Sequence, residues 1–118
     1  MTRLALITDL HANREAVESV LAHARQQGVD KYAFLGDFVG YGADPGWVVD
    51  MLREHMAQGA LAVMGNHDAA VVMGPTPAMV PAAREVVAWT RQRLSAEQIH
   101  VLGAYVWNLS QTATVAAK

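Results

Sequence analysis

The sequence predicts an α/β domain built on a small parallel sheet. Three short apolar segments alternate with amphipathic ones, and each apolar segment ends in a polar cluster. The apolar segments are residues 4–8, 32–35 and 60–64. The polar clusters begin at Asp9, Asp37 and Asn66, at intervals of 28 and 29 residues. A strand, a helix and the next strand together take about 30 residues, so the order β-α-β-α-β at this spacing indicates parallel strands with right-handed crossovers.

The first amphipathic segment, residues 13–27, is expected to form a helix. Its apolar side chains recur at the spacing that places them on one helical face. These are Ala16, Val17, Val20, Leu21 and Ala24. Gly28 follows at the position where helices commonly end in a left-handed residue.

A second helix is expected to begin at Asp44-Pro45. Aspartate is a favoured N-cap, and proline is tolerated at the first helical position because its missing N–H would be unpaired there. The apolar stripe that follows consists of Val48, Met51, Leu52 and Met56, and it stops before Gly59. Both helices belong to successive crossovers of the same hand, so we expect them to cover one face of the sheet.

Two further helices and a tail are expected in the second half. Glycine and prolines at 74–81 indicate a loop. A helix over 82–94 would turn Ala83, Val86, Val87, Thr90 and Leu94 inward. Ser95-Ala96-Glu97-Gln98 is a capping box for a short helix that closes near Gly103. Residues 104–118 form a divergent tail that is β-prone at best.

Length and composition exclude several classes of protein. A chain of 118 residues fits a single domain, and 53% hydrophobic against 17% charged residues excludes disorder. No apolar run is long enough to span a membrane, and a net charge of −2 lacks the basic footprint of a nucleic-acid-binding protein. The N-terminus does not resemble a signal peptide, so a cytoplasmic location is expected. The chain has no cysteine, which excludes disulfides, thiol nucleophiles and cysteine metal sites.

The polar clusters point to a metal site. Parallel strands bring their carboxyl ends to one edge of the sheet, where α/β folds bind ligands. Residues two apart on an extended chain point the same way, so Asp9 and His11 can bind one ion. With Asp37 and Asn66 they form a set of carboxylate, imidazole and amide ligands. This set suits Mn, Fe, Ni, Co or Zn better than Ca or Mg. Asp37, central in the sheet order, is the natural bridge between two ions about 3.5–4 Å apart.

Three motifs in this order resemble those of the calcineurin-like metallophosphoesterase superfamily. The residues around them are similar to its bacterial and archaeal phosphodiesterase branch. The motifs are Asp9-x-His11, Gly36-Asp37-Phe38-Val39-Gly40-Tyr41-Gly42 and Gly65-Asn66-His67-Asp68. The resemblance extends from residue 3 to about residue 103. It implies half of the α/β-β-α sandwich of that superfamily.

The resemblance also implies an activity, the hydrolysis of phosphodiesters or phosphomonoesters by a metal-activated hydroxide. Asp9 and His11 would bind the first metal, Asp37 would bridge both, and Asn66 would bind the second metal and substrate phosphate. His67 would act as general acid, oriented by a carboxylate, for which Asp68 is the candidate. Tyr41 stands near the place where the serine/threonine phosphatases carry an arginine, and with Asn66 and His67 it is a candidate substrate-binding residue.

One departure from the superfamily separates two hypotheses. Its members carry three further ligand histidines, whereas this chain has only His100 after His67, in a segment that matches neither motif. We therefore expect a truncated domain that holds one weakly bound ion or none and hydrolyses esters slowly. The alternative is a catalytically inactive fragment with a partial metal site that acts as a self-associating scaffold.

Structural explanations remain open for the individual residues. Asp9 and His11 could cap the helix that follows, Asp37 could be a turn acid, and Asn66 and Asp68 could be helix caps. The three strands are apolar on both faces, and the expected helices cover only one. We therefore predict a homo-oligomer, most simply a dimer, that buries Val106, Trp107 and neighbouring tail residues and exchanges the tail or the helix 82–94 between chains. A phosphate-ester small molecule is the expected ligand, with no nucleic acid and no membrane as partner.

Overall fold

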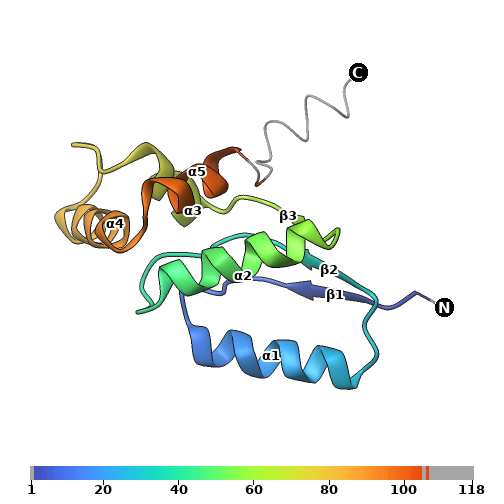
Figure 1. Cartoon of the computed structure of the whole chain (residues 1–118). Coiled ribbons are helices and arrows are strands. Elements are labelled where there is room, and N and C mark those ends of the chain that lie inside the picture. Colours follow the sequence, from blue (N-terminus) through green and yellow to red (C-terminus); the bar gives the residue numbers. More distant parts are fainter. Residues whose placement is uncertain (1, 105, 107–118) are drawn as a thin grey trace.

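The structure, a computed structural model, describes residues 2–104 and 106. This part of the chain contains a three-stranded parallel sheet and five helices (Figure 1). In chain order the elements are β1 (Leu4–Ile7), α1 (Arg14–Gln26), β2 (Lys31–Phe34), α2 (Pro45–Ala57), β3 (Leu61–Ala62), α3 (Asn66–Met73), α4 (Pro81–Arg93) and α5 (Ala96–Ala104). The predicted fold class and the order β-α-β-α-β are confirmed.

The sheet has the order β1-β2-β3, so β2 is central, as predicted. β1 pairs with the whole of β2, from Leu4 opposite Lys31 onward, whereas β3 pairs through two residues only. This third strand is shorter than the predicted 60–64. One further backbone hydrogen bond, from Val63 to the Phe34 carbonyl, follows the paired residues, and the Cα of Gly65 lies 2.9 Å from the position that a Cβ on Gly36 would take.

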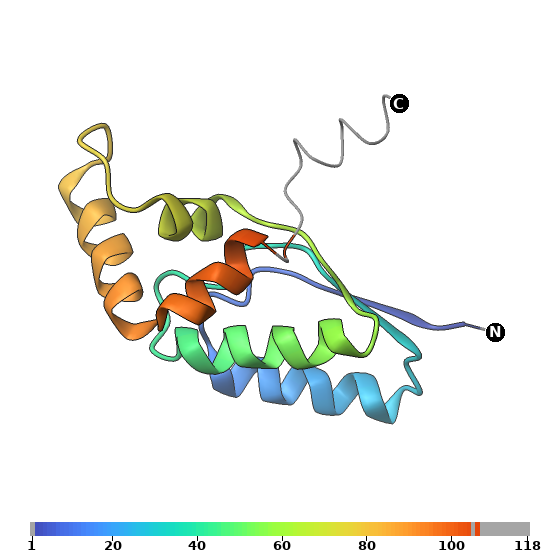
Figure 2. The ribbon, with the colours of Figure 1, turned by 45° about the horizontal axis from the view of Figure 1, so that its top comes forward.

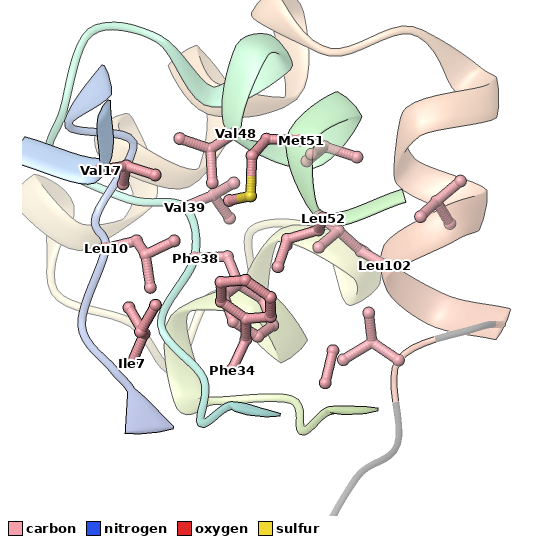
Figure 3. Close-up of a cluster of buried hydrophobic side chains, with 14 of the residues drawn as sticks. Ile7, Leu10, Val17, Phe34, Phe38, Val39, Val48, Met51, Leu52 and Leu102 are labelled. Carbon is pink, nitrogen blue, oxygen red and sulfur yellow. The ribbon is translucent and has the colours of Figure 1, made fainter. Parts of the chain in front are cut away.

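The core lies between the sheet and the two crossover helices. α1 and α2 cover the same face of the sheet, as expected (Figure 2). The largest side chains without solvent exposure there are Phe34, Phe38, Leu52 and Leu102. Figure 3 shows Phe34, Phe38, Leu52 and Leu102 within this cluster of buried side chains. The residues that follow β2 thus anchor the core as well as the edge of the sheet.

The ends of α1 were predicted correctly, but its apolar face was predicted too wide. The Asn13 side-chain oxygen accepts from the Ala16 N–H at 3.1 Å, and Gly28 has φ +69° at the C-terminal end. Val17 and Leu21 are buried. Ala16 and Val20 are exposed, because α1 packs along one side and no described element covers its flank.

Asp44 is the N-cap residue of α2, as predicted, but its side chain does not contribute to the cap. The helix begins at Pro45 as predicted, yet the side chain of Asp44 accepts no capping hydrogen bond. Its predicted stripe is otherwise present: Val48, Met51 and Leu52 are buried and Met56 is half-buried. Proline, with its fixed φ and absent N–H, suits the first position of the helix.

Three helices, not two, follow the sheet, and they lie together beyond its carboxyl end (Figures 1 and 2). The extra helix, α3, was not predicted, because its eight residues carry little amphipathic periodicity. The capping box of α5 is confirmed: Ser95 and Gln98 exchange hydrogen bonds of 2.8 and 3.0 Å. Gln98 also donates to the carbonyl of Gly46, which fastens α5 to α2.

The face of the sheet opposite α1 and α2 is exposed in the described part of the chain. The register aligns alternate side chains of the three strands on this face. Its exposed apolar residues are Leu4 (55% exposed), Leu6 (64%), Leu35 (43%) and Leu61 (50%). We call these four residues the leucine face. No described helix is long and apolar enough to cross a membrane.

The tail was expected to contribute to an interface between chains. Val106 instead packs into the core of its own chain, where it is 2% exposed. Trp107 and the rest of the predicted β-prone segment lie outside the described residues. The homo-oligomer itself stays a prediction.

Candidate functional site

The polar clusters meet where the loops after β1 and β2 run side by side. The N–H of Asp9 donates to the carbonyl of Gly36 at 3.1 Å, and the N–H of His11 donates to the carbonyl of Asp37 at 2.8 Å. These bonds extend the pairing of the two strands beyond the sheet. They hold the first and second motifs at a fixed spacing.

Asp9, His11 and Asp37 form one cluster of possible metal ligands. One ligand atom from each residue lies within 4.8 Å of the others. The Nε2 of His11 is 3.5 Å from an Asp9 carboxylate oxygen. The Nδ1 of His11 is buried and has no hydrogen-bond partner among the described residues. Two carboxylates with an imidazole that is not committed to other partners fit a divalent transition metal.

Left-handed backbone conformations concentrate at the same place. The non-glycine residues with positive φ in the described chain are Asp9 (57°), His11 (46°), Ala12 (55°), Asp37 (53°) and Tyr41 (71°). Such a conformation costs an L-residue about 1–2 kcal/mol, so surrounding contacts must impose it. Strained backbone of this kind clusters at binding and catalytic sites.

Two glycines allow these loops to approach each other. A Cβ on Gly42 would overlap the carbonyl of His11, and a Cβ on Gly65 would overlap the backbone nitrogen and the carboxylate of Asp37. No side chain fits at either position. The glycines therefore determine the distance between the motifs, not only the turn within each loop.

His67 lies beside the cluster with its ring uncommitted. Its backbone N–H donates to the Asp37 carboxylate at 3.1 Å. Its half-buried ring is 5.2 Å from the ring of His11 and 4.8 Å from that of Tyr41, measured between centroids. Gly40 leaves space for it, since a Cβ there would be 3.0 Å from Nδ1. Among the described residues no hydrogen bond occupies either ring nitrogen of His67, so both remain available to a substrate.

Asn66 is the first residue of α3, and its side chain is exposed. It follows Gly65, which packs on Asp37, and it shares a cavity with Tyr41 and His67. The helix start thus carries Asn66 to the edge of the cluster. Its role as a metal ligand stays a prediction.

Asp68 is fully buried and fastens the second motif to the third. One carboxylate oxygen accepts from the N–H groups of Phe38 and Val39 at 2.9 and 3.1 Å, and the other accepts from Gly65 at 2.9 Å. Burial raises the pKa of Asp68 to about 6, against the opposing effect of these hydrogen bonds. Its described hydrogen bonds therefore go to the backbone, and none reaches the ring of His67. The helix-cap interpretation accounts for the bond from Gly65.

Sequence reasoning did not single out Gly40 or Gly42. The available signal was two glycines on either side of Tyr41 within one polar cluster. Glycine at such positions is typical of close backbone approach, but the sequence does not reveal which segment comes close. The partners, His67 and His11, lie about 30 residues away in either direction.

A cavity of about 530 Å³ opens on the Asp9 side of the cluster. Its acidic lining residues are Asp9, Glu15 and Asp44. His11 and Tyr41 line it as well. A concave surface rich in carboxylates attracts cations, in agreement with the ligand chemistry of the cluster.

Known proteins resemble this chain in sequence and in fold. The sequence profile of the calcineurin-like phosphoesterases matches residues 2–108. An uncharacterised protein of Methanocaldococcus jannaschii is 42% identical over 69 residues, 58% of this chain and 27% of that protein. A metallophosphoesterase from Sphaerobacter thermophilus superposes with a TM-score of 0.70 at 36% identity. The match covers 87% of this chain and 41% of that one.

A candidate diadenosine tetraphosphatase superposes with a TM-score of 0.66 at 28% identity, over 87% of this chain and 42% of that one. The chain thus spans less than half the length of the proteins it matches. The profile match covers most of the sequence and includes all three motifs. The chain therefore belongs to the calcineurin-like phosphoesterase family.

Proposed function

We propose that the chain binds a divalent transition metal through Asp9, His11 and Asp37 and hydrolyses phosphate esters at that site. The observation that carries the proposal is the cluster itself, with three ligand atoms within 4.8 Å at the carboxyl edge of the sheet. Membership of the calcineurin-like phosphoesterases supports the same reaction class. Phosphodiesters and phosphomonoesters both fit.

The residues of the cluster suit one ion better than two. Mn, Fe, Ni, Co and Zn all accept mixed carboxylate and imidazole ligands. A bound ion would supply the positive charge that activates water and stabilises the charge developing on the phosphoryl oxygens. Asn66, at the edge of the cluster, would add an amide ligand or bind the substrate phosphate. With three or four protein ligands we expect weak binding of a single ion.

His67 is the proposed proton donor to the leaving oxygen. Its ring is half-buried beside His11 and Tyr41, and its described contacts leave both ring nitrogens free to act as acid. The hydrogen bond from its backbone N–H to the Asp37 carboxylate joins the proposed proton donor to the central ligand. Asp68 holds this loop in place, because its carboxylate accepts hydrogen bonds from backbone N–H groups on either side of the site.

Metal titration and hydrolysis together test the proposal. Calorimetric titration with Mn²⁺ should show one weak site, and bis(p-nitrophenyl) phosphate should be hydrolysed in a Mn²⁺-dependent manner. The rate should be about 10²–10³ below that of a complete family member, the usual cost of losing a preorganised stabiliser. Asp37→Asn should abolish both signals.

Asp30→Asn is the matched control, because Asp30 accepts a hydrogen bond from Arg3 at the opposite end of the sheet. Its amide oxygen can keep that bond, so binding and turnover should be unchanged. Equal Mn²⁺ affinity in the wild type and the Asp37 variant would refute the metal site. Turnover that survives Asp37→Asn would mean that the activity comes from elsewhere.

The leucine face supports a second candidate function, self-association. Leu4, Leu6, Leu35 and Leu61 form an exposed apolar row, and such patches commonly mark interfaces. We propose a two-fold dimer through this face. Sedimentation at micromolar concentration should show a dimer that Leu6→Glu dissociates, whereas Glu54→Gln on α2 should leave it intact. A monomer at all concentrations would contradict it.

A further inference from the structure

A second cavity adjoins the candidate site on the side of α4. It has a volume of about 370 Å³. Tyr41, Asn66 and His67 line one wall, so it opens directly beside the proposed proton donor. The opposite wall is aliphatic and consists of Met79, Val80, Ala83, Val86 and Val87. A polar reaction site thus borders an apolar pocket.

The apolar wall comes from a helical face that finds only part of its expected packing. Ala83 and Val86 belong to the stripe of α4 that was predicted to turn inward. Val87, on the same stripe, is buried, whereas Ala83 and Val86 are only half-buried and line the cavity. The hollow continues along α4 as a cavity of about 610 Å³ that reaches Trp89.

Tyr41 separates this hollow from the metal ligands. Its ring is 71% exposed and stands 5.4 Å from the ring of His11 and 4.8 Å from that of His67. Its left-handed backbone and the contact of Gly42 with the His11 carbonyl fix the loop that carries it. An aromatic ring is therefore held at the boundary between the two halves of the site.

We propose that the cavity receives a flat aromatic substituent of the ester substrate while the phosphate lies at the metal ligands. This inference rests on the proposed function. Three observations carry it: the ring of His67 lines the cavity and lies 5.2 Å from that of His11, the far wall is aliphatic, and Tyr41 offers a ring face for stacking. Glu85 is the one acidic or basic residue, histidine apart, on the described lining of either cavity, and it disfavours a second phosphate.

The preferred substrates are then aryl or nucleobase-bearing phosphate esters, in preference to alkyl or sugar phosphates. The first test avoids phosphate altogether. Benzyl alcohol should shift the methyl resonances of Val86 and Val87 in NMR titrations of the full chain, and should leave those of Val20, on α1, unchanged. Adenosine in place of benzyl alcohol distinguishes a nucleobase from a simple aryl ring as the occupant.

The larger side chain of Ala83→Leu fills the cavity and should weaken the binding of benzyl alcohol at least about fivefold. Ala88→Leu is the matched control, since Ala88 lies on the same helix and lines neither cavity. Its affinity should equal that of the wild type. No methyl shift in the wild type, or equal weakening in both variants, would overturn the proposal.

A second test joins the cavity to the phosphate site. In the presence of Zn²⁺, phenylphosphonate should bind about tenfold more tightly than methylphosphonate, a difference of about 1.4 kcal/mol. Ala83→Leu should remove that difference and keep methylphosphonate binding. Equal affinities in the wild type would overturn the proposal even though the metal site works. Benzyl alcohol binding without any phosphonate binding would instead refute the proposed function and the link to ester substrates.

Discussion

The loops at the carboxyl edge of the sheet and the leucine face are made of neighbouring residues, yet contacts with other residues constrain the loops far more tightly than the leucine face. In the loops, Gly42 and Gly65 have no room for a Cβ, and the carboxylate of Asp68 accepts three backbone hydrogen bonds. On the leucine face, Leu4 and Leu6 extend into solvent with more than half of their surface exposed.

The difference shows what determines the geometry of the ligand cluster. The three motifs are held by one another within residues 9–68, through backbone hydrogen bonds and through the carboxylate of Asp68. The exposed face of the sheet contributes stability only where another surface covers it. Substitutions in the loops should therefore be costly in this chain, and those on the leucine face should be nearly silent while it is monomeric.

The largest effect is expected from Gly42→Ala. The new Cβ would overlap the carbonyl of His11, which is backbone and cannot rotate away. We expect a loss of about 5 kcal/mol in the free energy of unfolding, in the range of severe overpacking and strain. Gly46→Ala is the control, because its nearest neighbour is the end of the flexible Gln98 side chain at 3.2 Å. Urea denaturation should find that variant within about 1 kcal/mol of the wild type.

The next largest effect is expected from Asp68→Ala, which should lower the free energy of unfolding by about 4 kcal/mol. It leaves three N–H groups, those of Phe38, Val39 and Gly65, without their acceptor. Asp68→Asn keeps one oxygen and should cost about 1–2 kcal/mol. Equal costs for the two variants in urea denaturation would mean that the hydrogen bonds are not what holds the loops together.

The pH dependence of the same residue gives a smaller effect. Burial raises the pKa of Asp68 from 3.8 to about 6 in the folded chain, so the folded state binds its proton more tightly than the unfolded state. Its contribution to stability is complete below pH 3.8 and is lost as pH rises toward and through 6. In metal-free buffer the wild type should lose up to about 3 kcal/mol relative to Asp68→Asn across that interval. A constant difference would show that the pKa of Asp68 is the same in the folded and the unfolded chain.

Two adjacent residues of β1, Ile7 and Leu6, allow a direct comparison of the core with the leucine face, and they give the smallest expected effects. Ile7→Ala removes a core side chain and should cost about 2–3 kcal/mol. Leu6→Ala removes a side chain that is 64% exposed and should cost about 0.5 kcal/mol. Thermal denaturation at low and high protein concentration measures both. A large cost for Leu6→Ala that appears only at high concentration would indicate that an interface covers the leucine face.

The spacing of the motifs was enough to predict that the side chains of Asp9, His11 and Asp37 would lie close together. Asp9, His11 and Asp37 each follow a strand of a parallel sheet, and strand pairing alone brings such residues to one edge. The helix ends at Gly28 and Ser95 could also be predicted from the sequence, because helix capping depends on residues that are neighbours in the chain. The metal-ligand role of Asn66 and the proton-donor role of His67 stay predictions.

What could not be predicted depends on contacts between distant residues. The left-handed backbone at Asp9 and His11 is imposed by the loop after β2, and no local pattern announces it. The bonds of Asp68 to Phe38 and Val39 join residues about 30 apart, so the carboxylate was assigned to the nearby His67 instead. The exposure of Val20 and the burial of Val106 likewise follow from which surfaces meet.

The backbone bonds between the first two loops also govern motion. The amide protons of Asp9 and His11 are donated across to the neighbouring loop, so solvent reaches them only when the loops separate. Such protons exchange together, in a single opening event, at a rate set by the free energy of that event. Fraying of α4 should not change the exchange of these two amide protons. The stability of the ligand cluster against opening is therefore that of this short extension of the sheet, and deuterium exchange measures it.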